Sequence, residues 1–530
     1  MTRARVIACV PFLVLALAVG GACGASPRPA VQRAAAPDWT TNAAADLRDD
    51  LRARQRPARV RYTGPHRLAG RVGLRASVHA GGARVVAVTF LIAGSPVGTD
   101  TTAPYRLDVD AARLPRGRHG VQVEAVDRLG VRARSALAGV SVGGAPRVDM
   151  TVTPGHGLQA ATAALRRGHA TVALGPGRYE IGHLRLGPGA ILLGAGPSTV
   201  LAAANGANAF ALVSAHGRRI RIADLAVDGA GRTDRAIAVV DGSADVRISR
   251  VHLSGMRLHG VDTWGVHSDV SVQDSVIAGG GAAAGAGVTD LGSDHSRDTS
   301  VVRTQISGFR GWGIDFAQRE YQRPAAALHN VALDNRISDI DDPTDDSGTK
   351  EGGIWSGGVA AAIVGNVVRR AGIDGIQTVG SSTRVSVVGN DVAETPVGIY
   401  LEHETHDSLF MRNAIAGVRT GINVEYTYDN AGSSNNVFAA NRIIGASATG
   451  VFVDLGADFH RIVDNVIGGA PGAAVILQGS SHNLVSGNVA CAGGAPEVVR
   501  EQPARLNGRI VVPNSNRVVG NRRVDACPGG

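Results

Sequence analysis

Aromatic residues are scarce in this chain of 530 residues, and glycine is abundant. Phe, Trp and Tyr together make up 4% of the residues, whereas 71 residues are glycine. Many glycines with few aromatic residues indicate a fold of turns and thin strands. The length exceeds that of one ordinary compact domain, so we expect two domains or a repeat array.

Lysine is almost absent, and arginine supplies nearly all of the formal net charge of +9. Lys350 is the only lysine in the chain. The arginines are scattered, without a basic run or interleaved aromatic residues, so the sequence does not predict nucleic-acid binding. A positive net charge instead favours an acidic polymer as a partner.

Long hydrophobic runs are absent, apart from one at the start of the chain. The run "VIACVPFLVLALAV" follows Arg3 and Arg5 and precedes small residues, which predicts a signal peptide over residues 1–25. The run is too short for a transmembrane helix, and no later segment qualifies. Cys23 resembles the lipid-attachment cysteine of lipoproteins, although Gly20 replaces the usual branched aliphatic residue. We therefore expect a protein that is secreted, or attached to the outer face of the cell membrane through that lipid alone.

Cysteine is rare, with four in the whole chain. Cys9 lies in the signal peptide, and Cys23 is either lipidated or removed. Cys491 and Cys527 remain. They predict a disulfide that closes the C-terminus in an oxidising compartment.

Two segments separate the signal peptide from the rest of the chain. Residues 26–57 are rich in Pro, Ala and Arg without sustained apolar periodicity, which predicts a linker. Residues 58–145 contain the strand-length runs "VVAVTFLIAG" and "HGVQVEAVD" between turn clusters. The stretch from Val88 to Gly130, with "SPVGTD" before "APY", resembles bacterial immunoglobulin-like modules of secreted enzymes. The resemblance implies a small β-sandwich that serves as a spacer or docking module.

Residues 146–530 are repetitive. A Gly-Ile or Gly-Val pair recurs about every two dozen residues, as at Gly398-Ile399 and Gly421-Ile422. An asparagine followed by an apolar step recurs with it: Asn335, Asn366, Asn390, Asn413, Asn441, Asn465, Asn488 and Asn521. No single unit can bury its apolar side alone, so successive units must stack.

The repeat resembles the right-handed parallel β-helix of the pectate-lyase-like superfamily. The opening "ATVALGPGRYEIGHLRLGPGAILLGAG" carries the resemblance, and "GLQAATAALRRG" is similar to the helix that caps the first coil. The resemblance implies an all-β right-handed parallel β-helix of about twelve coils, with an N-terminal capping helix, after the immunoglobulin-like β-sandwich. Each repeat asparagine is expected to take a left-handed turn conformation and bond to the asparagine one coil away.

Alternation along the strands predicts two outward columns of side chains. If Ile399 and Leu401 lie in the core, Tyr400 and Glu402 point outward. Equivalent strands lie about 4.8 Å apart, so the columns run from coil to coil. The first column comprises the carboxylates Glu402, Glu425 and Asp454. The second comprises Tyr400, Asn423, Phe452, Gln377, Trp355, Asp315, Thr289 and Asp262.

Stacked carboxylates require a cation, a nearby arginine or a raised pKa on one member. Raised carboxyl pKa values serve acid catalysis. The candidate catalytic residues are therefore Glu402, Glu425, Asp454, Tyr400 and His403, and the candidate substrate-binding residues are Asp315, Trp355, Gln377, Asn423 and Phe452. The alternative is ordinary surface polarity on a β-helix, with His403 in a solvated turn.

Three functions remain open: a polysaccharide hydrolase, a lyase or epimerase acting on uronates, and a non-catalytic polysaccharide- or wall-binding protein. The superfamily's hydrolases mostly invert, which by resemblance pairs Glu402 with Asp454, two strands apart. In a lyase, Tyr400 or His403 would be the base. The Asn-Thr-Asp, Asp-Asp and Gly-His-Gly signatures of galacturonan hydrolases are not found at strand ends.

An acidic insertion at residues 339–351 is either a surface loop or a Ca²⁺ site. No other cofactor is indicated, and metal ligands are unassigned. A monomer is expected.

Overall fold

The computed structural model describes residues 42–144, 148–283, 285–291, 297–316, 329–340, 351–402, 404–425, 432–491, 496–506 and 508–528. These residues belong to one compact unit, Asp38–Gly530. The predicted signal peptide, Cys23, His403 and residues 341–350 of the acidic insertion lie outside the described residues.

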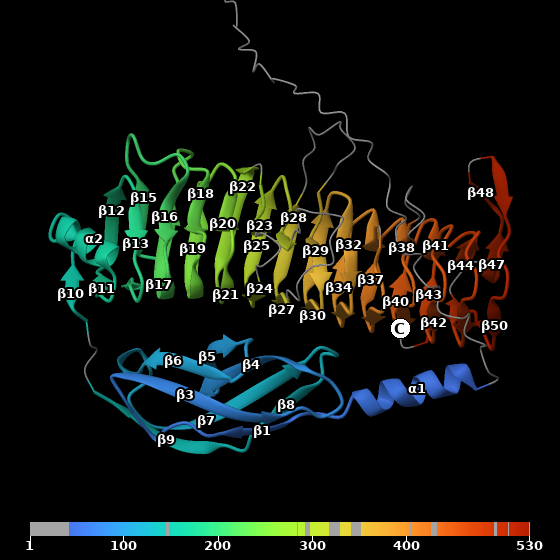
Figure 1. Cartoon of the computed structure of the whole chain (residues 1–530), viewed down its shortest axis with the longest axis horizontal. Coiled ribbons are helices and arrows are strands. Elements are labelled where there is room, and N and C mark those ends of the chain that lie inside the picture. The colour runs from blue at the N-terminus through green and yellow to red at the C-terminus, as the bar shows by residue number, and fades with distance from the viewer. Residues whose placement is uncertain are drawn as a thin grey trace, which may run out of the picture. The chain divides into compact units, whose positions relative to one another are not determined.

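The immunoglobulin-like module is a β-sandwich (Figure 1). A 3-stranded sheet contains β1 (Arg59–Tyr62), β3 (Arg71–His79) and β6 (Arg106–Asp110). A 6-stranded sheet contains β2 (Arg67–Ala69), β4 (Val85–Ile92), β5 (Ser95–Asp100), β7 (Gly117–Asp127), β8 (Arg132–Arg134) and β9 (Ala138–Gly143). Tyr62, Leu74 and Phe90 are buried between the sheets. The module thus relies on side-chain packing, because its sequence contains no cysteine.

Three strands per coil build a parallel β-helix (Figure 1). One 13-stranded parallel sheet takes one strand from each coil. Its members are β13 (Leu184–Leu186), β16 (Ala211–Ala215), β18 (Arg235–Val239), β20 (His259–Trp264), β23 (Val288–Leu291), β26 (Ile314–Phe316), β29 (Ile354–Val359), β32 (Asp374–Thr383), β35 (Val397–Leu401), β38 (Thr420–Val424), β41 (Thr449–Val453), β44 (Ala473–Gln478) and β47 (Glu497–Gln502).

The other strands of the coils form a 27-stranded sheet in which two consecutive strands of one coil pair with their equivalents in the next. Its members are β10 (Met150–Val152), β11 (Thr171–Leu174), β12 (Gly177–Ile181), β14 (Ile191–Leu193), β15 (Thr199–Ala203), β17 (Arg218–Asp228), β19 (Ala244–Ser254), β21 (Ser268–Gln273), β22 (Val276–Ala283), β24 (Arg297–Val302), β25 (Gln305–Phe309), β27 (Val331–Leu333), β28 (Arg336–Ile340), β30 (Ala362–Val364), β31 (Val367–Ala371), β33 (Ser386–Val388), β34 (Asp391–Ala393), β36 (Leu409–Met411), β37 (Ala414–Ala416), β39 (Val437–Ala439), β40 (Arg442–Ile444), β42 (Arg461–Val463), β43 (Val466–Gly468), β45 (Leu484–Ser486), β46 (Val489–Cys491), β50 (Arg517–Val519) and β51 (Arg522–Arg523).

The repeat asparagines form a continuous buried ladder between those two strands of each coil. In each step, Nδ2 of one asparagine donates to Oδ1 of the next at 2.9–3.0 Å, from Asn335 through to Asn521. The prediction of left-handed asparagines is wrong. The residue before each asparagine has the positive φ instead, for example Arg412 at 55° and Ala440 at 53°. That residue makes the turn, so the asparagine side chain points inward to its partners.

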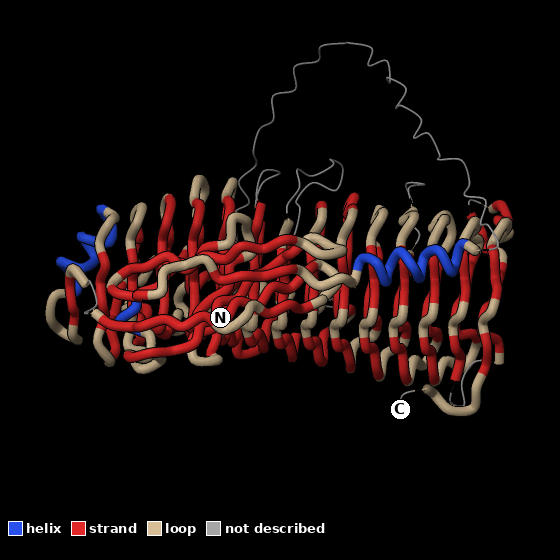
Figure 2. Tube along the Cα trace, turned by 90° about the horizontal axis from the view of Figure 1, so that it is seen from below, coloured by secondary structure: helices blue, strands red, loops and turns tan. Residues whose placement is uncertain are grey.

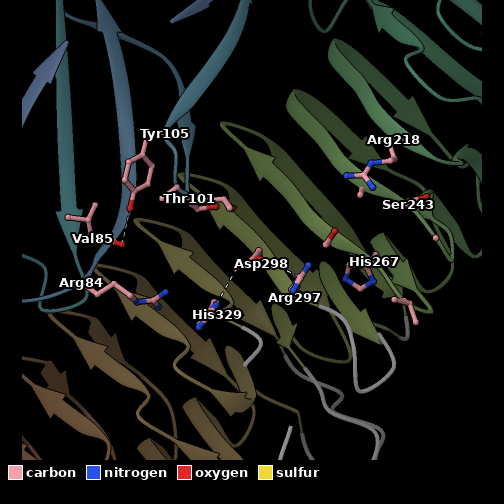
Figure 3. A pocket seen from close by; sticks show the side chains of 16 residues that line it. Arg84, Val85, Thr101, Tyr105, Arg218, Ser243, His267, Arg297, Asp298 and His329 are labelled. Carbon is pink, nitrogen blue, oxygen red and sulfur yellow. Dashed lines mark hydrogen bonds and ion pairs between the residues drawn. The ribbon is translucent and has the colours of Figure 1, made fainter. Parts of the chain in front are cut away.

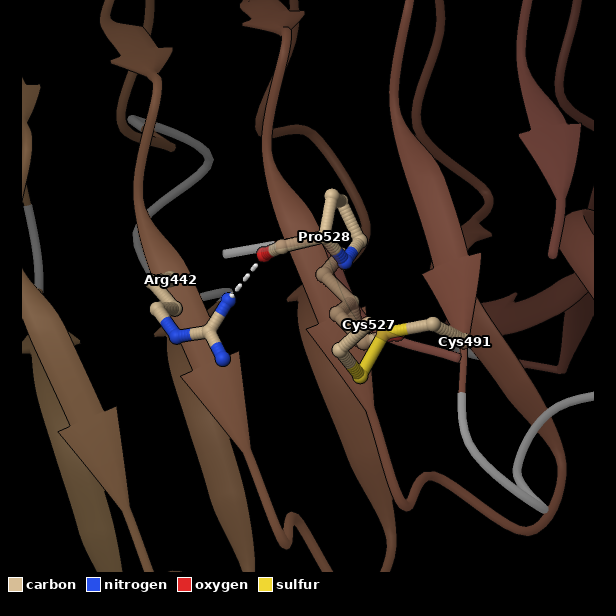
Figure 4. Close-up of a disulfide and its surroundings, with 5 residues drawn as sticks. Arg442, Cys491, Cys527 and Pro528 are labelled. Atoms are coloured by element: carbon tan, nitrogen blue, oxygen red, sulfur yellow. Dashed lines mark hydrogen bonds between the residues drawn. A yellow bond between two sulfur atoms is a disulfide. The ribbon is translucent and has the colours of Figure 1, made fainter. Parts of the chain in front are cut away.

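Both ends of the β-helix are covered. Helix α2 (Leu158–Arg167) buries Ala161 and Leu165 against the first coil, as the capping-helix prediction expected. At the other end, Cys491 and Cys527 form the predicted disulfide (Figure 4). The antiparallel pair β48 (Ala504–Leu506) and β49 (Arg509–Val511) lies within the loop that this disulfide closes.

The immunoglobulin-like module packs on the outside of the β-helix. Val86, Ala87 and Val126 of the module form a buried cluster with five residues of β24, β27 and β30: Val302, Val331, Leu333, Ala362 and Val364. Gln273 of β21 and Thr99 of β5 exchange two buried hydrogen bonds, at 2.6 and 2.8 Å. These contacts make the module part of one compact unit with the β-helix.

Helix α1 (Ala43–Arg54) continues this contact along the coils (Figure 2). Leu47 and Leu51 pack in a cluster that includes Val388 and Met411, and Arg48 forms an ion pair of 2.7 Å with Asp464. The helix lies within residues 26–57, where the sequence predicted a linker. Its buried face consists of Ala44, Leu47 and Leu51, too few large apolar residues to give a sustained periodic pattern.

Candidate functional site

The outward face of the 13-stranded sheet brings most of the predicted site residues together. The strand register pairs Asp315 with Trp355, Trp355 with Gln377, Gln377 with Tyr400, Tyr400 with Asn423, and Asn423 with Phe452. Thr289 and Asp262 extend this column in the other direction. The six residues from Asp315 to Phe452 therefore line one continuous row on six neighbouring strands.

Three carboxylates form the adjacent row. Glu402, Glu425 and Asp454 follow β35, β38 and β41 directly. Their backbone N–H groups donate to Thr378, Leu401 and Val424 of the preceding coil at 2.9, 3.1 and 2.9 Å. The backbone ladder thus continues through all three positions, which keeps them in register. All three side chains are half-buried. We call Glu402, Glu425 and Asp454 the carboxylate row.

The hydrogen bonds of the row differ between its members. The Gln377 amide donates to Glu402, and the Gln478 amide donates to Asp454 at 3.0 Å. Among the described residues, no side-chain donor reaches the carboxylate of Glu425. Burial raises the pKa of Glu425, and the charge of Asp454 raises it further. Glu425, whose protonated form is favoured, therefore lies between two carboxylates, Glu402 and Asp454, that accept amide hydrogen bonds.

Asp374 is a fourth carboxyl group near the row, and the sequence analysis missed it. Its side chain is 1% exposed, and neither carboxyl oxygen has a hydrogen-bond partner. Burial raises its pKa well above the usual range, and Glu402 and Glu425 add to this effect. A signal existed in the sequence: the equivalent positions in the next four coils are Val397, Thr420, Thr449 and Ala473, none of them acidic.

Two tryptophans border the site on the side of Asp315. Trp312 and Trp355 stack with ring centroids 5.5 Å apart and an interplanar angle of 20°. A Cβ atom at Gly352 would come within 2.6 Å of the Trp312 ring, so only glycine fits beneath it. The buried Nε1 of Trp355 has no hydrogen-bond partner. A polar group of a ligand is the kind of acceptor that this N–H lacks.

The residues that follow the strand of Glu402 are more ordered than a solvated turn. Thr405 is fully buried, and His406 forms isolated β-bridges to Thr383 and Ser434. Nδ1 of His406 lies 2.8 Å from Ser434 Oγ, and burial lowers its pKa. His406 therefore continues the stacking of the coils. His403 is not described, so its predicted role as a base stays a prediction.

Neither a metal centre nor a membrane span is found in the described part of the chain. No group of three or more His, Cys, Asp or Glu side chains among those residues could hold a metal ion. No helix within the same ranges is long and apolar enough to span a bilayer.

A cavity lies elsewhere, between the immunoglobulin-like module and the β-helix (Figure 3). Its volume is about 850 Å³, and Arg84, Tyr105, Arg218, His267, Arg297 and His329 are among its lining residues. Among the described residues that line it, Asp298 is the carboxylate, and its Oδ1 lies 3.6 Å from Nδ1 of His329. None of the predicted site residues is among the described residues that line this cavity.

Comparison with known families assigns the two parts of the chain. Residues 65–123 match the family model of the bacterial Ig domain, and residues 347–490 match that of the right-handed β-helix region. The chain is thus a right-handed parallel β-helix protein with an N-terminal bacterial immunoglobulin-like module, which confirms the prediction from its sequence. No curated protein sequence matches the chain.

Solved structures similar to the chain include β-helices of different function. A family 28 exopolygalacturonase from Yersinia enterocolitica is 11% identical, covers 89% of this chain and 100% of its own, and gives a TM-score of 0.47. The A-module of a mannuronan C-5 epimerase from Azotobacter vinelandii is 16% identical over 69% and 94%, with a TM-score of 0.44. A surface adhesin of Streptococcus pneumoniae is 13% identical over 68% and 94%, with a TM-score of 0.38. The activities named for these proteins are not assigned to this chain.

Proposed function

We propose that this chain is a secreted, carbohydrate-active β-helix protein that hydrolyses a polysaccharide at the carboxylate row. The observation that carries the proposal is the asymmetry within the row. Glu402 and Asp454 each accept a glutamine amide, whereas Glu425 between them has a raised pKa and accepts no side-chain hydrogen bond from the described residues. Glycoside hydrolysis needs a carboxylic acid beside a carboxylate, held in different environments.

In this proposal Glu425 is the general acid and Asp454 is the nucleophile. Glu425 gives its proton to the glycosidic oxygen as the bond from that oxygen to the anomeric carbon breaks. Asp454 attacks the anomeric carbon and forms a glycosyl ester. Glu425, now a carboxylate, takes a proton from a water molecule, and that water displaces Asp454 from the sugar. At the end Glu425 is protonated and Asp454 is a carboxylate again, so the net reaction consumes one water for each glycosidic bond that is broken.

We favour this pair over the predicted pair of Glu402 and Asp454. The charge of Asp454 acts on the pKa of Glu425, which supports direct proximity between these two groups. Their strands, β38 and β41, are neighbours and so about 4.8 Å apart. Carboxyl groups about 5–5.5 Å apart are typical of hydrolases that retain the anomeric configuration. Glu402 and Asp454 are two strands apart, and this wider separation would suit a hydrolase that inverts the anomeric configuration.

The aromatic and polar row beside the carboxylates suits a sugar polymer. Trp355, Tyr400 and Phe452 offer ring faces, and Asn423 offers an amide. The disulfide between Cys491 and Cys527 supports action outside the cytoplasm, where thiols are not kept reduced. Lipid attachment at Cys23 and a monomeric state remain predictions.

A screen of polysaccharides with the purified protein tests the proposal. Reducing ends and unsaturated uronates are measured in parallel, with heat-denatured protein as the control. We expect new reducing ends without unsaturated products, and an initial product of the same anomeric configuration as the substrate by NMR. Unsaturated uronates would show a lyase, and binding without turnover would show a non-catalytic binder; either result contradicts the proposal.

A further inference from the structure

An exposed aromatic pair lies on the 13-stranded sheet, far from the carboxylate row. Phe210 directly precedes β16 and is 39% exposed, and Trp264 ends β20 and is 44% exposed. Their ring centroids are 6.2 Å apart at an interplanar angle of 70°. Large apolar side chains that remain exposed together on a soluble protein are typical of a binding surface.

An arginine holds this pair in place without giving it a net charge. The Arg235 guanidinium lies 4.4 Å from the centre of the Phe210 ring and 5.9 Å from that of Trp264. Arg235 also forms an ion pair with Asp262, which is fully buried. The carboxylate neutralises the guanidinium and restricts its movement. We call Phe210, Arg235 and Trp264 the aromatic platform. Its two partly exposed rings lie beside a neutralised ion pair, and it is therefore suited to a sugar ring more than to a charged group.

The aromatic platform lies on the same sheet as the carboxylate row. Val261 is equivalent to Ile399 through the unbroken register of β20, β23, β26, β29, β32 and β35. Trp264 lies three residues after Val261, as Glu402 lies three residues after Ile399. Alternation then directs both side chains outward. The two positions are five strand steps apart, or about 24 Å along the sheet.

We infer that the aromatic platform is a remote subsite that binds a sugar ring of the same polysaccharide, so that the chain runs along the sheet from Trp264 to the carboxylate row. This inference rests on the proposed function for the identity of the ligand. It adds that a long chain occupies both places together, whereas a short oligosaccharide reaches the carboxylate row alone. Two linked contacts raise the affinity for the long chain above that for the short one.

Binding measurements test the subsite separately from turnover. Trp264→Ala and Phe210→Ala are compared with Leu137→Ala, which removes a side chain that is 69% exposed on the immunoglobulin-like module. The probes are polygalacturonate, alginate, an α-1,3-glucan and a β-1,4-glucan, each as long polymer and as short oligosaccharide, in affinity gels. Circular dichroism checks the fold, and Trp264→Tyr keeps an aromatic ring at the same position.

We expect both platform variants to lose about tenfold or more in affinity for one long polymer, while the affinity for the short oligosaccharide stays within about twofold. Leu137→Ala should change neither value, and Trp264→Tyr should retain most of the affinity. Unchanged polymer affinity in both platform variants, equal losses for long and short chains, or no binding of any polymer by the wild type would overturn the inference. Binding with this pattern but without turnover would support the subsite and contradict the proposed hydrolysis.

Discussion

Glu425 is the carboxyl group of the row whose charge is least compensated. Like charges on neighbouring strands destabilise a sheet, and Glu425 lies between two others. Glu425→Gln removes the central charge and keeps nearly the same size. We predict that the free energy of unfolding at pH 7 stays level or rises by up to about 1 kcal/mol. Urea unfolding of the two proteins measures this, and a clear loss of stability would show that the Glu425 charge is stabilised by a partner.

Asp374 gives the row a dependence of stability on pH. Its pKa in the folded protein is raised, so folding favours the protonated form. Its stabilising contribution is complete below the unfolded pKa of about 3.9 and is lost as pH rises through the folded pKa. Between the unfolded and the folded pKa of Asp374, the free energy of unfolding falls by about 1.4 kcal/mol for each pH unit.

Asp374→Asn should remove this loss, because asparagine does not ionise. We predict that the variant is more stable than the wild type at pH 7 and that the two unfolding free energies converge as pH falls toward about 4. Urea unfolding at a series of pH values measures the difference. A constant difference across the series would mean that Asp374 is ionised in the folded protein.

The asparagine ladder joins the coils through buried side-chain hydrogen bonds. Asn413 accepts from Asn390 and donates to Asn441 and to the carbonyl of Val387. Asn413→Ala leaves several buried polar groups without partners, each worth about 1–3 kcal/mol. We predict a loss of about 2–4 kcal/mol in unfolding free energy. Asn205→Ala, at an exposed position, is the matched control and should change stability little. Equal effects of the two substitutions would argue against a structural ladder.

The immunoglobulin-like module and helix α1 cover apolar side chains that point out of the β-helix. Val302, Leu333 and Val364 are buried in one cluster with apolar side chains of the module. We predict that a protein of residues 148–530 has a lower Tm than the full chain and binds a hydrophobic dye more strongly. Thermal unfolding and dye fluorescence measure both effects.

The double substitution Leu333→Ser and Val364→Ser in the shortened protein tests whether the uncovered apolar side chains cause the dye binding. These substitutions should reduce the dye fluorescence, because they remove apolar surface from the uncovered strip. A shortened protein with the Tm of the full chain and no dye binding would show that the β-helix is complete without the module.

The sequence predicted the features that depend on a local period and missed those that depend on distant contacts. The Gly398-Ile399 pair and its equivalents fix which residues point outward, so the carboxylate row followed from alternation. Asp374 precedes such a pair, and its signal lay in the comparison with the equivalent positions Val397 and Thr420, not in the alternation that was used. Val331, Ala332 and Leu333 form a buried strand, and the residues that pack on the outer two come from more than 200 positions earlier in the chain. Those contacts leave no periodic trace in the sequence.

Turnover by Glu425→Gln, measured on the polysaccharide that the screen identifies, tests the central claim most directly. Glu180→Gln, at an exposed position on β12, is the matched control for loss of a carboxylate. If Glu425 is the general acid, kcat of Glu425→Gln falls by about 100-fold or more with the fold intact, while Glu180→Gln keeps the wild-type value. Wild-type turnover by Glu425→Gln would contradict catalysis by the carboxylate row as described.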